Sequence, residues 1–368
     1  VNKEGLIEVV GNDIPRIDYT DSTEGALLLE NSSTNLITQS EDFSDAAWSK
    51  GGSSVVGGFS APNGTNNAYK LVENTSTSTH YLQEFISQAD GSTNTMSLFA
   101  KKAERNHITI YCGGSFTDSY TFNLNNGTSV NNGNSTSKIE LISNGWYKCS
   151  VTSINKSRDV YIMSNNGDVG TSGVAYQGDG TSGIYVWGAQ LEVGNLSSYI
   201  PTNGSIIQRA AETCNDSGNS EVFNSEQGVL FANIAALSDD SSYKTLSLND
   251  NSASDRIQIS INSNNIYIGV IDGGSTQVFD SVSVTDATNF NKVVVSYKVN
   301  DCNLWINGFK VFTDTNASMP SGLSKINFDK GDGGDDFYGK TKEIAYYDTA
   351  LTDSELETLT SYRSLNEM

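Results

Sequence analysis

Two stretches of the sequence decide the fold class: KIELISNGWYKCSVTSI (Lys138–Ile154) and NLWINGFKVF (Asn303–Phe312). In both, apolar and polar side chains alternate on either side of an Asn-Gly pair. Alternation with a period of two predicts a strand with one buried face, and Asn-Gly favours two-residue hairpin turns. Each stretch therefore predicts a β-hairpin. In the second hairpin we expect Leu304 and Ile306 on the face opposite Trp305.

Short alternating segments recur between turn clusters along most of the chain. They include MSLFAKK (Met96–Lys102), HITIYC (His107–Cys112), YTFNLNNG (Tyr120–Gly127), RDVYIMS (Arg158–Ser164) and IYVWGAQLEV (Ile184–Val193). Helical periodicity is confined to the tail, where Thr352 and Glu355 match a capping box and Leu356, Leu359 and Tyr362 fall on one face. The sequence predicts an all-β protein of two β-sandwich (jelly-roll) modules in tandem with a short C-terminal helix.

The domain boundaries follow from where the alternation weakens. A chain of 368 residues is long enough for two modules with separate cores. We predict an N-terminal lead-in over 1–30 and a first jelly roll over 31–200. Residues 201–225 carry little alternation and are predicted to be a connector. The second sandwich is predicted over 226–350, and the helix over 351–368.

The charge and the cysteines exclude several function classes. The net charge of −21 argues against nucleic acid and against an anionic membrane surface, because both require clustered Lys and Arg. No apolar run approaches the roughly 20 residues that span a bilayer, so membrane insertion is not expected. The four cysteines have neither the density of a disulfide scaffold nor the spacing of a zinc site, and buried free thiols are predicted.

Two longer segments carry a resemblance to a known family. IPRIDYTDSTEGALLLENSSTNLITQSEDFSDAAWSK (Ile14–Lys50) and WGAQLEVGNLSSYIPTNGSIIQRAAE (Trp187–Glu212) resemble the opening and closing segments of a module common in phage tail and fibre proteins. Ser33 stands where that family usually has Arg. The resemblance implies a carbohydrate-binding jelly roll, a virion location, a plausible homotrimer, and further residues upstream of Val1.

The second half resembles a different superfamily. GVLFANI (Gly228–Ile234), the Asn303–Phe312 hairpin and DFYGKTKEIAYYDTALTDSEL (Asp336–Leu356) are similar to the concanavalin-A-like, laminin-G-like sandwich. That fold serves lectins, glucanases and structural modules alike, so the resemblance implies a fold rather than an activity.

Catalysis is not expected in this chain. The Glu-x-Asp-x-Glu strand of retaining glucanases, which sets two carboxylates about 5 Å apart, does not occur in the second half. His80 and His107 are the only histidines, which leaves few candidates for imidazole acid–base or nucleophilic chemistry. No catalytic residue is therefore assigned.

Acidic residues suggest where a structural Ca²⁺ ion would bind. The loop DKGDGGDD supplies closely spaced carboxylates, which suit the six to eight oxygen ligands that Ca²⁺ prefers. Its carboxylates belong to Asp329, Asp332, Asp335 and Asp336. The resemblance to glycan-binding jelly rolls adds Glu192 and the pair Glu41–Asp42 as ligands between the first and last strands. The alternative is that these carboxylates are solvated and only increase the solubility of the protein.

Sugar recognition requires flat aromatic rings that stack on pyranose faces, with polar groups beside them for the hydroxyls. Trp48, Trp146 and Trp187 are predicted to be core residues. Trp305 and Tyr243 are predicted to be exposed enough to contact a sugar, and so is Tyr176 in the loop GVAYQGDGTSG.

Three hypotheses remain open at this point. The preferred one is a non-catalytic, lectin-like fibre protein of a phage particle that attaches to host surface polysaccharide. The second is a structural spacer or decoration protein that binds other virion proteins. The third is the binding portion of a polysaccharide depolymerase whose catalytic domain lies outside this chain.

Overall fold

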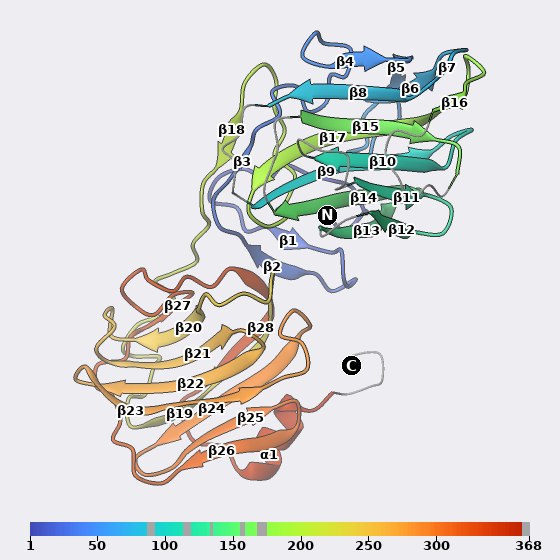
Figure 1. Ribbon diagram of the computed structural model, residues 1–368. Coiled ribbons are helices and arrows are strands. Elements are labelled where there is room, and N and C mark those ends of the chain that lie inside the picture. The colour runs from blue at the N-terminus through green and yellow to red at the C-terminus, as the bar shows by residue number, and fades with distance from the viewer. Residues whose placement is uncertain (87–92, 113–118, 133–134, 155–158, 168–174, 363–368) are drawn as a thin grey trace. The chain divides into compact units, whose positions relative to one another are not determined.

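The chain folds into two compact units (Figure 1). The computed structural model describes residues 1–86, 93–112, 119–132, 135–154, 159–167 and 175–362. Unit 1 contains Val1–Val9 and Ser32–Ala210, and unit 2 contains Val10–Asn31 and Ala211–Met368. All strands pair antiparallel, which confirms the all-β prediction of two β-sandwich modules with a short C-terminal helix.

Unit 1 is built on two six-stranded sheets, which we call sheets I and II. Sheet I contains, in spatial order, β12 (Thr128–Asn132), β11 (Ser119–Asn123), β10 (His107–Cys112), β15 (Asp159–Asn165), β8 (His80–Phe85) and β4 (Ser49–Gly51). Sheet II contains β13 (Thr136–Ser143), β14 (Trp146–Ile154), β9 (Thr93–Lys102), β17 (Gly183–Val193), β6 (Ala68–Glu73) and β5 (Ser53–Phe59). Two short pairs complete the unit: β16 (Tyr176–Gln177) with β7 (Thr77–Ser78), and β18 (Ile207–Arg209) with β3 (Ser33–Asn35).

The main core of unit 1 is formed by alternate side chains of both sheets. Leu82, Ile110 and Ile162 come from sheet I, and Leu98 and Val186 from sheet II; none is exposed. Each such aliphatic side chain contributes about 1.5–3 kcal/mol on burial. The three tryptophans of this unit are also buried, which confirms their prediction as core residues: Trp48, Trp146 and Trp187.

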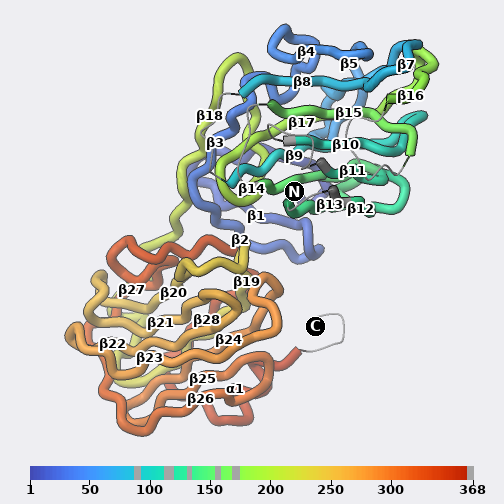
Figure 2. Tube along the Cα trace, in the orientation of Figure 1, coloured from blue at the N-terminus to red at the C-terminus, as the bar shows by residue number. Residues whose placement is uncertain are grey.

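Unit 2 is built on sheets III and IV (Figure 2). Sheet III contains β1 (Ile17–Asp18), β2 (Ala26–Leu29), β28 (Gly339–Tyr347), β19 (Gln227–Ala236), β24 (Asn291–Lys298), β25 (Cys302–Ile306) and β26 (Phe309–Asp314). Sheet IV contains β23 (Ser275–Ser283), β22 (Asn265–Asp272), β21 (Arg256–Asn262), β20 (Lys244–Asn249) and β27 (Lys325–Asn327). Their inner faces share one core that includes Leu230, Leu246, Ile259, Ile268 and Leu304.

The division into units differs from the predicted boundaries at both ends of the first module. The segment predicted as a free lead-in supplies β1 and β2 of sheet III, with Leu28 in register with Lys340 and Leu29 in the core of unit 2. The predicted connector is also structured, because β18 pairs with β3 and Phe223 packs into the core of unit 2. The two modules are therefore not strictly consecutive in the chain.

The predicted turns form as expected. Asn144 and Gly145 join β13 to β14, and Asn307 and Gly308 join β25 to β26; all four residues have positive φ. That pair of conformations is the one that a two-residue type I′ turn requires.

The helix α1 (Asp353–Thr360) begins with the predicted capping box between Thr352 and Glu355. It is shorter than the predicted 351–368, because Ser361 is already extended; residues 363–368 lie outside the described part of the chain. Leu356 packs under the helix against sheet III. Within the described residues, no helix combines the length and apolar content that crossing a membrane requires.

The cysteines conform to the prediction only in part. Cys149 and Cys302 are buried free thiols, as predicted. Cys214 is free but exposed, so the prediction of burial was wrong there, because this residue lies in the segment between the two sandwiches rather than on a strand. The side chain of Cys112 lies outside the described residues.

Candidate functional site

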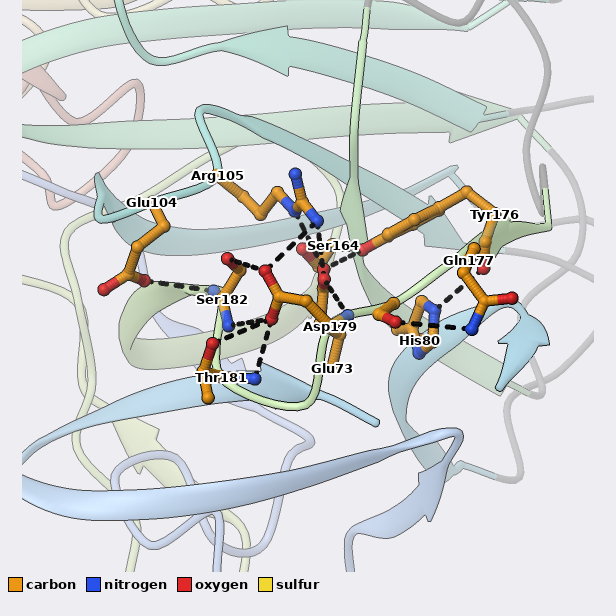
Figure 3. A network of polar contacts seen from close by, with 12 residues as sticks. Glu73, His80, Glu104, Arg105, Ser164, Tyr176, Gln177, Asp179, Thr181 and Ser182 are labelled. Carbon is orange, nitrogen blue, oxygen red and sulfur yellow. Dashed lines mark hydrogen bonds and ion pairs between the residues drawn. The ribbon is translucent and has the colours of Figure 1, made fainter. Parts of the chain in front are cut away.

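Tyr176, one of the three predicted sugar contacts, is part of a buried polar network at one end of unit 1 (Figure 3). Its centre is Glu73, whose side chain is fully buried at the end of β6. Arg105 donates to both carboxylate oxygens of Glu73, from Nε at 2.8 Å and from Nη2 at 2.6 Å. The phenol of Tyr176 donates to Glu73 Oε2 at 2.8 Å, and the backbone N–H of Asp179 donates to Oε1 at 2.9 Å.

The same network fixes the ring of Tyr176. The centroid of the ring lies 4.5 Å from the centroid of the His80 imidazole. It lies 5.5 Å from Cζ of Arg105. Burial would raise the pKa of Glu73, but the hydrogen bonds from Arg105, Tyr176 and the Asp179 N–H, together with the charge of Arg105, outweigh it and lower that pKa below its usual range. A tyrosine that is 6% exposed, with its phenol on Glu73 and its ring against His80 and Arg105, acts as a strut and has little surface left for a sugar.

Trp305, the second predicted contact, is 5% exposed, and the prediction of exposure was wrong. It projects from the outer face of sheet III, opposite Leu304 and Ile306 as predicted. That outer face is covered by α1, whose Leu356 packs into the same cluster as Trp305. The ring is therefore enclosed by a segment about fifty positions later in the chain.

The acidic residues predicted to hold a cation in unit 1, Glu192 and the pair Glu41–Asp42, are engaged with protein donors. Glu41 accepts from Asn67 Nδ2 at 2.6 Å and from Tyr199 OH at 3.0 Å. Glu192 is fully buried and accepts hydrogen bonds from Ser33 Oγ at 2.6 Å and from Ser197 N at 2.9 Å. Asp42 accepts from Ser44 N at 2.9 Å and from Tyr69 OH at 2.8 Å. The hydrogen bonds from Ser44 lower the pKa of Asp42 below its usual range. These carboxylates belong to separate local networks.

The acidic loop of unit 2 is also held by its own hydrogen bonds. Asp329 is buried and accepts from Asn215 Nδ2 at 2.7 Å, whereas Asp332 and Asp335 are exposed. Asp336 accepts from the phenol of Tyr338 at 3.0 Å. In the described part of the chain, no three His, Cys, Asp or Glu side chains are grouped as a metal site. Binding of Ca²⁺ stays a prediction.

Tyr243, the third predicted contact, lies in a partly exposed aromatic cluster on sheet IV. Its ring centroid is 5.2 Å from that of Tyr267 and 6.3 Å from that of Phe279. Tyr267 and Phe279 lie 5.4 Å apart with their planes tilted by 31°. Phe279 is 48% exposed, and both tyrosines are half-buried. We call Tyr243, Tyr267 and Phe279 the sheet IV aromatic cluster.

The strand register explains why these rings meet on the outer face. Ile266 and Ile268 of β22 point into the core, so Tyr267 between them points outward. In register, Tyr267 lies opposite Ser281, and Gly269 lies opposite Phe279. A Cβ atom at Gly269 would come within 2.6 Å of Gln258 Cγ, so the missing side chain leaves the space that Gln258 fills.

A ladder of polar side chains continues from the rings across the same face. Arg256 Nε donates to Gln258 Oε1 at 2.5 Å, and Gln258 Nε2 donates to Ser260 Oγ at 3.0 Å. Ser260 Oγ lies 2.9 Å from Thr245 Oγ1. The loop with Asp335 borders this ladder, because Asp335 O accepts from Thr245 N at 2.9 Å. The aromatic rings thus lie beside ordered polar groups.

The electrostatics keep the phenol of Tyr243 neutral. Burial first, and then the neighbouring Tyr267 and the carboxylate of Asp335, raise the pKa of Tyr243 above its ordinary value. Burial lowers the pKa of Arg256, while Asp332 and Asp335 oppose that effect. The face therefore combines the neutral phenol of Tyr243 with the guanidinium of Arg256 and two carboxylates, Asp332 and Asp335, which Lys330 also approaches at 3.9 Å.

Sequence reasoning found one of the three rings in this cluster. Tyr267 and Phe279 lie at alternating outward positions of NIYIGVID and STQVFDSVS, so the period of two carried the signal for both. The alternation does not predict that β22 and β23 pair with each other, or in which register. The structure also brings Asp335, predicted as a metal ligand, next to Tyr243.

Comparisons with known proteins give no family. No family model matches the chain, and no curated protein matches it. Among solved structures the fold is similar to the CBM40 of the Ruminococcus gnavus IT-sialidase, at 15% identity and a TM-score of 0.35 over 41% of this chain and 97% of that chain.

Two further similar structures are equally remote. The leech intramolecular trans-sialidase is 18% identical over 41% of this chain and 27% of its own, with a TM-score of 0.34. The botulinum neurotoxin type G receptor binding domain is 13% identical over 40% of this chain and 45% of its own, with a TM-score of 0.31. These likenesses are too weak to carry a functional conclusion.

Proposed function

We propose that this chain is a non-catalytic carbohydrate-binding protein and that a sugar stacks on the sheet IV aromatic cluster. The observation that carries the proposal is the partly exposed ring set of Tyr243, Tyr267 and Phe279 beside the polar ladder of β20 and β21. Pyranose rings present C–H faces that pack on aromatic rings, and their hydroxyls need fixed polar partners. The rings of the cluster supply the first. Because Thr245, Gln258 and Ser260 are themselves buried, the partly exposed Arg256 and the exposed Asp335 supply the polar partners at the margin of the face.

The biological setting of the proposal is a phage fibre that attaches to host surface polysaccharide. Its support is the resemblance of Ile14–Lys50 and Trp187–Glu212 to phage tail and fibre segments. The high acidic charge supports a soluble surface protein and disfavours a nucleic-acid partner. Fibres carry many copies of each site, so weak single-site binding is sufficient there.

A polysaccharide array tests the proposal directly. The intact chain is applied to immobilised capsular and cell-wall polysaccharides, once with Ca²⁺ and once with EDTA. Tyr267→Ala and Phe279→Ala are expected to weaken binding about tenfold each, the loss of roughly 1.4 kcal/mol that a stacked ring supplies. Phe309→Ala is the matched control, because Phe309 is 72% exposed on β26 of the other sheet.

Two outcomes of this experiment contradict the proposed function, and a third contradicts the placement of its site. If the chain binds no polysaccharide in either buffer, the carbohydrate proposal is wrong and the structural spacer is favoured. If new reducing ends or unsaturated sugars appear on incubation, the chain is catalytic and the non-catalytic assignment is wrong. Equal loss in Phe279→Ala and Phe309→Ala contradicts the placement of the site on sheet IV.

A further inference from the structure

Unit 1 carries a second set of partly exposed aromatic rings, on the outer face of sheet I. The ring centroid of Tyr161 lies 5.3 Å from that of Tyr81 and 5.4 Å from that of Tyr111. Tyr81 and Tyr161 are half-buried, whereas Tyr111 is 2% exposed and supports Tyr161 from one side. We call Tyr81, Tyr111 and Tyr161 the sheet I tyrosine row.

The register of sheet I places these rings on one face. β8, β15 and β10 are hydrogen-bonded neighbours and run side by side in Figure 2. Tyr161 lies opposite Tyr111 on one side and opposite Gln83 on the other. Leu82 and Ile162 are core residues, so the residues that alternate with them, Tyr81 and Tyr161, point outward.

Two further residues extend the exposed part of this surface. The ring of Tyr81 lies over Gly51 of β4, where a Cβ atom would come within 2.2 Å of the ring. Phe85, two positions beyond Gln83 on β8, is 67% exposed. Phe85 therefore adds exposed ring surface next to the partly exposed tyrosines.

Polar groups lie next to the rings. Gln83 Nε2 donates to Asp159 Oδ1 at 3.3 Å. Burial and the neighbouring carboxylate of Asp159 raise the pKa of the Tyr161 phenol, while Gln83 opposes them with a hydrogen bond. The phenol is therefore neutral at ordinary pH. Gln83, Asp159 and Tyr161 together offer an amide, a carboxylate and a hydroxyl at the edge of the aromatic surface.

We infer that the sheet I tyrosine row, with Phe85, Gln83 and Asp159, is a second carbohydrate-binding surface and that it takes uncharged sugars. Its sugar ligand class rests on the proposed function. The charge decides between neutral and acidic sugars, because Asp159 is the one ionised side chain among these six residues. A carboxylate accepts hydrogen bonds from sugar hydroxyls and repels uronate or sulfate groups.

The buried network around Tyr176 differs from the sheet I tyrosine row in how much ring surface it leaves exposed. There the phenol donates to Glu73 and the ring lies against His80 and Arg105. In the tyrosine row, the faces of Tyr81 and Tyr161 remain partly exposed, and the polar atoms lie at the margin of the rings. The two arrangements use the same residue types, and only the second leaves ring surface for a ligand.

Calorimetric titration of the intact chain tests this inference. The probes are neutral tetrasaccharides of glucose, galactose, mannose or N-acetylglucosamine, and a tetrasaccharide of glucuronic acid. We expect Tyr81→Ala and Tyr161→Ala to weaken a neutral-sugar site about tenfold each. The conservative variant Tyr161→Phe keeps the ring and is expected to lose less. Tyr147→Ala is the control, because Tyr147 is a half-buried tyrosine on sheet II.

The variants separate the two sites. Loss in Tyr81→Ala and Tyr161→Ala with full binding retained at sheet IV, and the reverse in Tyr267→Ala, supports a site on each unit. If only Tyr267→Ala weakens binding, the proposed function stands and the second surface is refuted. If only the sheet I variants weaken binding, the second surface stands and the sheet IV placement is refuted. Preferential binding of the glucuronic acid probe through Tyr161 overturns the assignment to uncharged sugars.

A folding control keeps these outcomes interpretable. Every variant is first compared with the wild type by thermal unfolding, and Gln83→Ala is added because it removes a polar contact without removing a ring. Reduced neutral-sugar binding in Gln83→Ala with an unchanged unfolding midpoint supports the surface. Full binding in both Gln83→Ala and Tyr161→Phe, combined with an unfolded Tyr161→Ala, contradicts it, because the row would then be structural.

Discussion

The end of unit 1 and the outer face of sheet IV both place tyrosine beside carboxylate, and they use it in opposite ways. Tyr176 donates to a fully buried Glu73 that Arg105 also contacts, and its ring has almost no exposed surface. Tyr243 lies near an exposed Asp335, in a cluster whose outermost ring is half exposed. Covering by distant segments, and not residue type, therefore separates a strut from a binding surface.

The largest expected effect tests a covered ring against an exposed one in the same hairpin. Trp305→Ala is expected to reduce the free energy of unfolding by about 3–5 kcal/mol, because it leaves a cavity under α1. Phe309→Ala, four positions later and exposed, is expected to change it by less than about 0.5 kcal/mol. Differential scanning calorimetry measures both. Similar costs for the two variants contradict the covering of Trp305.

The next effect tests the buried network. Arg105→Ala is expected to destabilise unit 1 by about 3 kcal/mol, because it leaves the buried carboxylate of Glu73 without its cation. Arg105→Lys is expected to fall between wild type and Arg105→Ala, since an ammonium group does not reproduce the bidentate contact. Denaturant titration in a Trp305→Phe background, followed by the fluorescence of Trp48, Trp146 and Trp187, reports on unit 1. An unchanged midpoint in Arg105→Ala shows that the network is not a structural strut.

A smaller effect compares two carboxyl groups of the same unit. Glu84 is 5% exposed and accepts from Thr38 N at 3.2 Å and Thr38 Oγ1 at 3.0 Å, through Oε1. Burial raises the pKa of Glu84, whereas Arg105, Tyr176 and the Asp179 N–H together hold the pKa of Glu73 down against burial. Glu84 therefore favours the folded state in its protonated form.

The sign of the pH dependence follows from that raised pKa. The stability that Glu84 contributes is complete below the unfolded-state pKa of about 4.3 and is lost as pH rises through the higher folded-state pKa. Glu84→Gln is expected to remove this loss. The free energy of unfolding of the variant, relative to that of the wild type, therefore increases between pH 4 and pH 7. The gain is on the order of 1 kcal/mol, typical for one buried polar group. Parallel stability curves over that range refute it.

Much of the fold was predictable because the local alternation of apolar and polar residues specifies the strands and their buried faces. Leu304 and Ile306 were placed on the inner face by the period of two, and Asn307-Gly308 specified the turn by its backbone conformations. The pairing of β2 with β28 was not predictable in this way. Leu28 and Lys340 are in register although more than 300 positions separate them, and no local pattern encodes that contact.

The candidate sites were predictable only in part, for the same physical reason. The sequence predicts that the rings of Tyr176, Trp305 and Tyr243 lie at exposed or loop positions. It does not show which of these rings are covered by other segments. Trp305 is covered by α1, and Tyr176 is enclosed by His80 and Arg105. Neither contact involves residues close in sequence. Tyr243 remained accessible and gained Tyr267 and Phe279 as neighbours through the register of sheet IV.

The most direct test of the account is the affinity of Phe279→Ala and Phe309→Ala for the polysaccharide that the wild type binds, measured by calorimetric titration. Both residues are exposed phenylalanines of unit 2, and they lie on different sheets. We expect a dissociation constant about tenfold higher for Phe279→Ala and an unchanged one for Phe309→Ala. Wild-type affinity in Phe279→Ala would contradict the placement of the site on sheet IV.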